Sequence, residues 1–277
     1  MDSLRTLRYP SLFGIRNLRF VEADVRAGLQ RLPDETYTAL IHLAAITDAE
    51  GSVGKAEEVR RNNLEGTESA AEFCLQRKIP MIFPSSTSVY GSQSSRVDED
   101  CPPDQLRPQS PYAETKLEEE KLIADFRNQG LRSIVLRLAT IAGPSPGMRF
   151  HTAVNKFCWQ ACLGQPVTVW KTALHQKRPY LALEDAVDSF LGAVQALAAP
   201  ECPGLVNVVT RNHTVDEILG MIRRWRPSLQ VKMTESRIMN QLSYEVVSRY
   251  AEKIGFIPRG SIESCIQKTL EWLPSPA

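Results

Sequence analysis

Pro80-Met81-Ile82-Phe83 is a run of apolar residues that shows no alternation with polar ones. Ala39-Leu40-Ile41-His42-Leu43 is a second such run, interrupted only by its histidine. Continuous apolar runs of this length are typical of parallel strands that are buried on both faces. A helical pattern rich in Ala, Glu, Leu and Arg covers about 55–77, between the two runs. A strand, a helix and a second strand in this order predict a βαβ unit in a parallel sheet.

The pattern continues in both directions from this unit. Residues 18–22 are interpreted as an earlier short strand, and residues 132–138 predict a later one. A helical pattern over 111–127 begins with Pro111, has Ser110 as a candidate N-cap, and ends at Gly130. We therefore expect a doubly wound α/β fold, in which a parallel sheet carries helices on both faces.

The character of the chain changes after Gly143-Pro144-Ser145-Pro146-Gly147. From there, short strands alternate with helical patterns. We expect helices at about 150–163, 184–198, 214–225, 244–254 and 261–272, and strands at 167–170, 178–183 and 205–209. This order predicts a first domain over 1–147 and a smaller mixed α/β lobe over 148–277. Part of that lobe, 178–209, is expected to return to the first domain.

The composition argues against several classes of protein. The 277 residues are 43% hydrophobic and 23% charged, as in ordinary globular proteins, and their net charge of +1 predicts no nucleic-acid partner. No apolar stretch approaches the roughly 18 residues of a membrane helix, and no signal peptide follows Met1. The six cysteines form no CxxC pair. We therefore expect a cytoplasmic protein with reduced thiols, no metal site and no membrane partner.

Ligands of open parallel sheets bind beyond the carboxyl ends of the strands. Small, acidic and hydroxyl-bearing residues gather at those places in this chain. They are Glu22-Ala23-Asp24, Ala44-Ala45, Pro84-Ser85-Ser86-Thr87 and Ala139-Thr140, each directly after a predicted strand. This clustering indicates a binding site at that edge of the sheet.

Tyr112-Ala113-Glu114-Thr115-Lys116 places a tyrosine and a lysine four residues apart, on one face of the expected helix. The ordinary pKa of a tyrosine is about 10, which makes it a poor base at neutral pH. A neighbouring ammonium lowers that pKa, and the tyrosine can then exchange a proton with a substrate hydroxyl. Taken alone, the motif is more typical of a solvated helix face, and Ser85-Ser86-Thr87-Ser88 alone is typical of a polar loop.

The order of the motifs is more specific than any single one. It resembles the extended short-chain dehydrogenase/reductase superfamily and, within it, the NAD-dependent epimerase/dehydratase family that acts on nucleotide sugars. The resemblance is carried by His42-Leu43-Ala44-Ala45, Asn62-Asn63-Leu64-Glu65-Gly66-Thr67, Ser85 to Gly91, Tyr112 to Lys116, Leu136 to Pro144, Arg178 to Asp185 and Ile254 to Pro258. It implies a Rossmann-type fold, NAD as the cofactor, a nucleotide-sugar substrate and a homodimer.

The resemblance also implies roles for individual residues. Tyr112 would be the acid/base, and Lys116 its partner, which also holds the nicotinamide ribose. Ser86, rather than Thr87, stands at the position of the family's catalytic hydroxyl. The substrate would contact Ser86, Thr87, Thr140 and Arg178, with the guanidinium on the diphosphate.

For the cofactor, the resemblance implies a second group of residues. Asp24 and Val25 would meet the adenine, and Asp2 would bond a ribose hydroxyl. Asp2 favours NAD over NADP because its carboxylate would repel a 2′-phosphate, although Arg5 and Arg8 follow closely. The phosphates and ribose would be lined by Leu43, Ala44, Ala45 and Thr47, with Asn63 beside them.

One departure from the family is large. The family opens with a GxxGxxG turn that holds the cofactor pyrophosphate at a helix N-terminus. Gly51-Ser52-Val53-Gly54-Lys55 is the nearest match, but it stands in the wrong place and is interpreted as a loop. We therefore expect the chain to begin one βα unit late, by roughly thirty residues. This would weaken cofactor binding by the chain alone.

The residues after Ser86 bear on the reaction. Family members that remove water or carbon dioxide from the sugar typically carry an acidic residue there, whereas Thr87 and Ser88 have no carboxylate. This favours a 4-epimerase of the UDP-glucose type. The alternatives are an NAD(P)-dependent reductase of the same superfamily and a catalytically silent binding protein. The helices at 55–77 and 111–127 would pair in the homodimer, where Leu117, Ile123 and Phe73 serve either the interface or the core.

Overall fold

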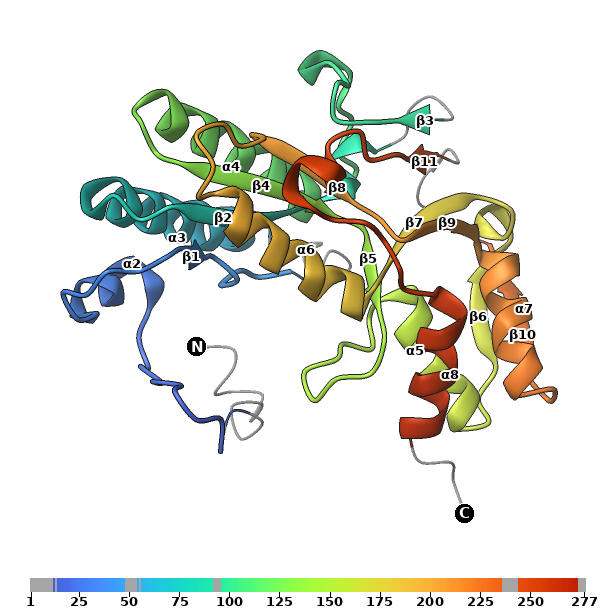
Figure 1. Ribbon diagram of the computed structural model, residues 1–277. Helices are drawn as coiled ribbons and strands as arrows, with labels where there is room; N and C mark the ends of the chain where they lie inside the picture. Colours follow the sequence, from blue (N-terminus) through green and yellow to red (C-terminus); the bar gives the residue numbers. More distant parts are fainter. Residues whose placement is uncertain are drawn as a thin grey trace.

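A four-stranded parallel sheet forms the centre of the molecule (Figure 1). The computed structural model describes residues 14–47, 56–91, 96–235 and 244–273, together with Leu12 and Gly54. The sheet has the order β1-β2-β4-β8, from β1 (Leu40–Ile41), β2 (Met81–Ser86), β4 (Ser133–Leu138) and β8 (Leu205–Val208). The expected doubly wound α/β fold is confirmed.

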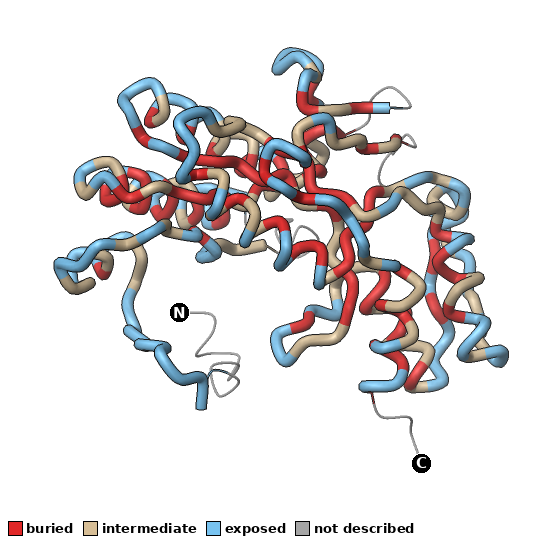
Figure 2. Tube along the Cα trace, in the orientation of Figure 1, coloured by how far each residue is buried: buried red, intermediate tan, exposed pale blue. Residues whose placement is uncertain are grey.

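Helices cover both faces of this sheet. Helices α3 (Ala56–Arg77) and α4 (Pro111–Asn128) lie side by side on one face, and α6 (Leu183–Ala196) lies on the other (Figure 1). Met81 and Phe83 of β2 pack in the cluster with α3 and α4, whereas Ile82 between them packs in the cluster with α6. Because successive side chains of a strand point to opposite faces, both faces must be apolar. This accounts for the continuous apolar run, and Figure 2 shows it as buried chain at the centre.

Local signals set the ends of α4. The Ser110 hydroxyl accepts a hydrogen bond from the Ala113 amide at 3.2 Å, as predicted for an N-cap, and Pro111 occupies the first helical turn. After the helix, Gly130 has a φ of 104°, which residues with a side chain rarely adopt. The start of this helix was therefore predictable from its sequence.

The C-terminal lobe is built from smaller sheets and three helices. Its helices are α5 (Ala153–Cys162), α7 (Val215–Trp225) and α8 (Ile262–Trp272). Strand β6 (Val167–Trp170) pairs with β10 (Val231–Thr234), and β7 (Lys177–Ala182) lies between β5 (Thr140–Ala142) and β9 (Arg211–Thr214). The division into domains at residue 147 stays a prediction, although β8 pairs with β4 of the central sheet.

Three sequence-based predictions about the fold are wrong. The run 39–43 is not buried on both faces, because β1 lies at the edge of the described sheet, where Ile41 and Leu43 are 40% and 66% exposed. Residues 18–22 form no strand, because within the described residues no neighbouring strand offers hydrogen bonds to them, and the Phe20 side chain is half exposed. The helix expected over 244–254 is instead β11 (Glu245–Val246), which pairs with β3 (Arg96–Val97), followed by the short 3-10 helix η6 (Ala251–Ile254). The remaining short elements are α2 (Val25–Gly28), η2 (Leu29–Arg31), η3 (Thr87–Tyr90), η4 (Pro103–Gln105) and η5 (Lys171–Ala173).

Two of the three residues left open between core and interface lie in the core. Phe73 and Ile123 are 2% and 0% exposed and belong to the cluster between the sheet and helices α3 and α4. Leu117 packs against the cluster on the α6 side. All six cysteines are free thiols, four of them buried.

Within the described ranges, we find no helix with the length and apolar character needed to cross a membrane.

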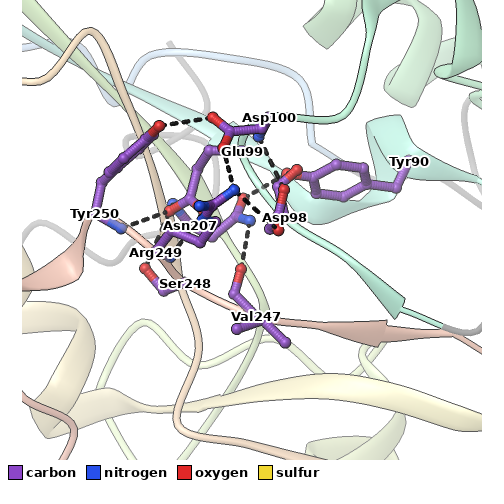
Figure 3. Close-up of polar contacts among 9 residues, drawn as sticks. All are labelled: Tyr90, Asp98, Glu99, Asp100, Asn207, Val247, Ser248, Arg249 and Tyr250. Atoms are coloured by element: carbon purple, nitrogen blue, oxygen red, sulfur yellow. Dashed lines mark hydrogen bonds and ion pairs between the residues drawn. The ribbon is translucent and has the colours of Figure 1, made fainter.

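The Glu99 carboxylate joins three distant segments (Figure 3). It accepts hydrogen bonds from the Asn207 amide at 2.8 Å, the Arg249 amide at 2.9 Å and the Ser248 hydroxyl at 3.1 Å. Asn207 lies in β8, and its side chain reaches the Tyr90 hydroxyl at 2.9 Å. Glu99 is 8% exposed, so each bond is shielded from water. This carboxylate ties the segment after β11 to the central sheet.

We predict that Glu99→Gln lowers the free energy of unfolding by about 3 kcal/mol, because a Gln amide would direct N–H groups at backbone donors. Asp100→Asn is the matched control, since Asp100 bonds Arg249 and Tyr250 at the surface and is 44% exposed. Its loss should stay below about 1 kcal/mol. Urea unfolding of both variants measures the difference, and equal losses would contradict the role of Glu99.

Candidate active site

Ser86 and Tyr112 meet at the carboxyl end of β2. Ser86 is the last residue of that strand, and its hydroxyl accepts hydrogen bonds from the Ser88 amide at 3.2 Å and the Ser88 hydroxyl at 2.9 Å. Tyr112 stands in the first turn of α4, and a hydrogen bond with Ser86 acts to lower its pKa. The structure therefore brings together the hydroxyls of two residues that are 26 positions apart.

Other influences on Tyr112 are stronger than this hydrogen bond. Burial raises the pKa of the phenol above its ordinary value, and the negative charge of Glu119 raises it further. Arg149 and Ser86 act in the opposite direction without cancelling the rise. The expectation of a lowered pKa at Tyr112 is therefore wrong for this structure, because burial and the charge of Glu119 outweigh the influences that lower it.

Lys116 has a carboxylate partner in Glu119, one helical turn further along α4. Lys116 Nζ lies 3.1 Å from Glu119 Oε2, and both side chains are almost completely buried. The ammonium also lies 4.5 Å from the centre of the Phe83 ring and 6.0 Å from that of Tyr112. Lys116 is therefore in the predicted place, on the same helix face as Tyr112, with its charge balanced by its neighbour.

A second ion pair fastens α4 to the sheet. Arg137 of β4 donates to both carboxylate oxygens of Glu120, at 2.9 and 2.6 Å, and the Ser85 hydroxyl of β2 donates to the same carboxylate at 2.5 Å. The Arg137 guanidinium also lies over the Tyr90 ring, 4.8 Å from its centre. Because the pair is bidentate and buried, it fixes the rotation and register of the helix that carries Tyr112.

The predicted substrate residues lie on different elements of the fold. Thr87 is buried, and its hydroxyl lies 3.4 Å from the Leu138 carbonyl, so it joins the ends of β2 and β4. Thr140 opens β5, opposite Tyr180 in β7. Arg178 lies two residues before Tyr180 in the same strand, with its guanidinium over the Tyr244 ring at 5.1 Å. Ser86, Tyr112 and Lys116 thus lie on β2 and α4, whereas Arg178 lies on β7.

The residues expected at the cofactor surround the carboxyl end of β1. Leu43 is 66% exposed and Ala44 is exposed beside it, while Ala45 is half-buried. The fully buried Asn63 of α3 holds this loop, because its side-chain amide exchanges hydrogen bonds of 2.8 and 2.9 Å with the backbone of Ile46. The strand end is therefore shaped by α3 and leaves an accessible apolar and backbone surface.

Two buried polar atoms at this strand end have no hydrogen-bonding partner within the described part of the chain, Thr47 Oγ1 and His42 Nε2. Such atoms are rare in folded proteins and usually mark a place for a ligand or water. Asp24, followed by Val25, caps α2, and hydrogen bonds from Arg26 lower the pKa of the Asp24 carboxyl to about 2. Asp2 lies outside the described residues. An unpartnered hydroxyl beside an exposed apolar strand end fits a nucleotide cofactor with a ribose and a flat ring.

Sequence reasoning gave no role to three residues around Ser86, Tyr112 and Lys116. Ser88 bonds Ser86, Glu119 pairs with Lys116, and Arg149 acts on Tyr112 from the segment between β5 and α5. The spacing of 112, 116 and 119 along one helix face was a signal for Glu119. Arg149 lies far away in sequence and offered no such signal.

A family model for the NAD dependent epimerase/dehydratase family matches residues 4–208, about three quarters of the chain. This protein belongs to that family. The match covers Ser86, Tyr112 and Lys116, as well as the whole central sheet. NAD is the cofactor on which the family depends.

Known relatives agree with this assignment. The chain is 27% identical to a trifunctional UDP-glucose 4,6-dehydratase/UDP-4-keto-6-deoxy-D-glucose 3,5-epimerase/UDP-4-keto-L-rhamnose-reductase of Arabidopsis thaliana, over 92% of this chain and 39% of that protein. It is 26% identical to the UDP-glucose 4-epimerase of Azospirillum brasilense, over 91% of this chain and 78% of that protein. The chain thus spans about two fifths of the plant relative's length.

A solved structure supports the fold independently. The UDP-glucose 4-epimerase of Brucella ovis, in complex with NAD, superposes with a TM-score of 0.81 at 25% identity, covering 93% of this chain and 85% of that one.

His42 makes the stability of this strand end depend on pH. Burial, aided by the charge of Lys116, lowers the pKa of His42 to about 4, against about 6.5 in an unfolded chain. Between these values only the unfolded state takes up the proton, so the free energy of unfolding falls as pH falls through this window. We predict a loss on the order of 3 kcal/mol between pH 7 and pH 4 from this residue.

His42→Phe should remove most of that slope while preserving the ring that stacks on Phe83. Urea unfolding at pH 7, 5.5 and 4.5 measures it. His175→Gln, at an exposed position, is the control. A slope in His42→Phe as steep as in the wild type would show that another group is responsible.

Proposed function

We propose that this protein is a nucleotide-sugar 4-epimerase of the UDP-glucose type. The observation that carries the proposal is that Ser86 ends β2 close enough to Tyr112 to lower the pKa of its phenol, with Lys116 one turn further along α4. Relatives that share the family include a UDP-glucose 4-epimerase and a dehydratase, so the choice between reactions depends on the site itself.

The residues after Ser86 favour epimerisation. Dehydratases and decarboxylases of the family typically place a carboxylate there as an additional acid/base group, whereas this chain has Thr87 and Ser88. Thr87 is buried against β4 and Ser88 bonds Ser86, so these hydroxyls have structural partners. An epimerase needs one residue that exchanges a proton with the sugar hydroxyl, and Tyr112 suffices for that.

In the proposed reaction, bound NAD would supply the hydride acceptor for the sugar and the donor that reduces the keto-sugar again. The phenol oxygen of Tyr112 takes the proton of the 4-hydroxyl and returns it after the keto-sugar has rotated to present its other face. Ser86 orients the same hydroxyl by a hydrogen bond. Because Ser86 lies close enough to Tyr112 to lower the pKa of its phenol, one sugar oxygen would reach both hydroxyls.

The remaining residues would hold the two ligands. Lys116 would donate to the hydroxyls of the nicotinamide ribose. The strand end formed by Leu43, Ala44, Ala45 and Thr47 would line the phosphates and the second ribose, near Asp24 and Val25. Arg178 of β7 would bind the substrate diphosphate, and Thr140 would contact the sugar.

One observation favours a second candidate, an NAD(P)-dependent reductase. The pKa of Tyr112 lies above its ordinary value, so the resting residue is a phenol with a proton to donate. Proton donation is what the reduction of a carbonyl requires, whereas epimerisation begins with proton removal. Reduction of a keto-sugar without epimerisation would replace the first proposal.

The direct experiment is to incubate the protein with NAD and UDP-glucose and to look for UDP-galactose by proton NMR. The N-acetylated and uronic acid analogues serve as further substrates. Conversion of at least one of them is expected. If the protein binds NAD and epimerises none of them, the proposal is wrong.

We predict that Tyr112→Phe reduces the rate of epimerisation by roughly 10²–10⁴-fold and leaves the fold intact, because only the phenol oxygen can exchange the proton. Ser86→Ala should reduce the rate less, since it removes an orienting hydrogen bond only. Tyr37→Phe, which removes a hydroxyl bonded to the Pro33 carbonyl, is the matched control and should retain wild-type rates. Turnover at the wild-type rate in Tyr112→Phe would refute the assigned site.

We also propose that the protein is a homodimer in which α3 and α4 of two copies pack together. Both helices lie on one outer face of the sheet, and their inner apolar residues are used by the core, so the contact would be formed by their outward sides. Light scattering at micromolar concentration should give about twice 31.0 kDa. A single species of 31.0 kDa would exclude the dimer.

A further inference from the structure

Helix α4 carries a buried carboxylate beside the proposed catalytic pair. Glu119 is 0% exposed and lies three residues after Lys116, on the face of the helix that also carries Tyr112. Its Oε2 atom is 3.1 Å from Lys116 Nζ. The same helix therefore supplies the tyrosine, the lysine and the counter-charge of the lysine.

Glu119 is held in place from a second helix. The Thr67 hydroxyl of α3, itself 0% exposed, donates a hydrogen bond of 2.6 Å to Glu119 Oε1. Lys116 is enclosed on its other side by the Phe83 ring. A charge this deeply buried is stable only when it is paired. Lys116 and Glu119 pair with each other at 3.1 Å, and the Thr67 hydroxyl supplies the hydrogen bond to the second carboxylate oxygen.

We propose that Glu119 is a positioning residue of the Tyr112–Lys116 pair, which holds the Lys116 ammonium in place and offsets its charge at Tyr112. The inference rests on the acid/base role proposed for Tyr112. Its consequence is that Tyr112 ionises at a higher pH than it would beside a lysine with no opposing carboxylate.

The other charged groups around Tyr112 do not replace Glu119 in this role. His42, at the end of β1, has a pKa of about 4 and is uncharged at neutral pH. Arg149 faces Tyr112 from the segment after β5 and favours the phenolate, opposite to Glu119. Two further carboxylates of α4 have their own cationic partners. Glu120 pairs with Arg137 on the sheet side, and Glu118 pairs with Arg60 at the surface. Glu119 is the carboxylate that opposes Lys116.

The test follows the ionisation of Tyr112 directly, without substrate or cofactor. The protein is labelled with 3-fluorotyrosine, whose phenol is more acidic than that of tyrosine, and the ¹⁹F NMR signal that disappears in Tyr112→Phe is assigned to residue 112. The pH dependence of that signal is then measured in the wild type and in Glu119→Gln. Glu118→Gln is the matched control, because it makes the same charge change on the neighbouring, partly exposed residue.

In Glu119→Gln the transition of residue 112 should move to lower pH by about one unit, which is about tenfold more phenolate at a given pH. In Glu118→Gln it should stay within about half a unit of the wild type. An unchanged transition in Glu119→Gln, or an equal shift in Glu118→Gln, would overturn the inference.

A second variant covers the case in which Glu119→Gln does not fold because Lys116 is left unpaired. Lys116→Met/Glu119→Gln removes both charges, so the transition of residue 112 should lie within about half a unit of the wild type. A large shift in this double variant would mean that Glu119 does not offset Lys116, and would overturn the inference as well.

The titration tests the positioning role of Glu119, and the epimerase assay tests the proposed reaction, so a failure of one is distinguishable from a failure of the other. A shift in Glu119→Gln with no epimerisation by the wild type would support the positioning role and refute the proposed reaction. Epimerisation by the wild type with no shift would do the reverse. Where both succeed, the acid limb of the pH–rate profile should move to lower pH in Glu119→Gln by the amount found in the titration.

Discussion

The buried ion pair between Glu120 and Arg137 determines where helix α4 lies on the sheet. Arg137 of β4 is 4% exposed and meets the carboxylate with two hydrogen bonds, and Ser85 of β2 adds a third. Removing one partner of such a pair typically costs about 3–5 kcal/mol, because the other charge is left buried alone. The helix therefore cannot slide or turn without breaking this contact. Tyr112, two turns earlier, is brought to Ser86 as a consequence.

A second buried pair explains the electrostatic character of the site. Lys116 and Glu119 balance each other, and Thr67 ties the carboxylate to α3. A YxxxK motif is expected to favour the phenolate, but a lysine does so only to the extent that its charge is uncompensated. Here the compensation is built into the helix, so the pKa of Tyr112 is raised by burial and by Glu119. The surroundings of the motif, and not the motif itself, determine its acidity.

Buried carboxylates also connect the C-terminal segments to the sheet. Glu99 accepts hydrogen bonds from β8 and from the residues after β11. Asp185, at the start of α6, accepts 2.9 Å bonds from the amides of Arg259 and Gly260 and a further bond from the Thr210 hydroxyl. Each carboxylate accepts hydrogen bonds from several backbone amides that would otherwise be buried without a partner.

The sequence by itself determined the elements whose signals are local. The apolar run at 80–83 predicts β2. The helical pattern at 111–127 and its Ser110 cap predict α4, and the four-residue spacing places Tyr112 and Lys116 on one face of that helix. The strand expected at 18–22 failed because a strand exists only beside a partner. The clearest limit is Glu118-Glu119-Glu120, three identical residues in a row. Helix geometry turns each by about 100° from the last, so one pairs with Arg60 at the surface, one with Lys116 and one with Arg137. Only the packing of α4 against α3 and β4 decides which carboxylate meets water, which meets the sheet and which lies beside the lysine. That packing therefore also decides the acidity of Tyr112.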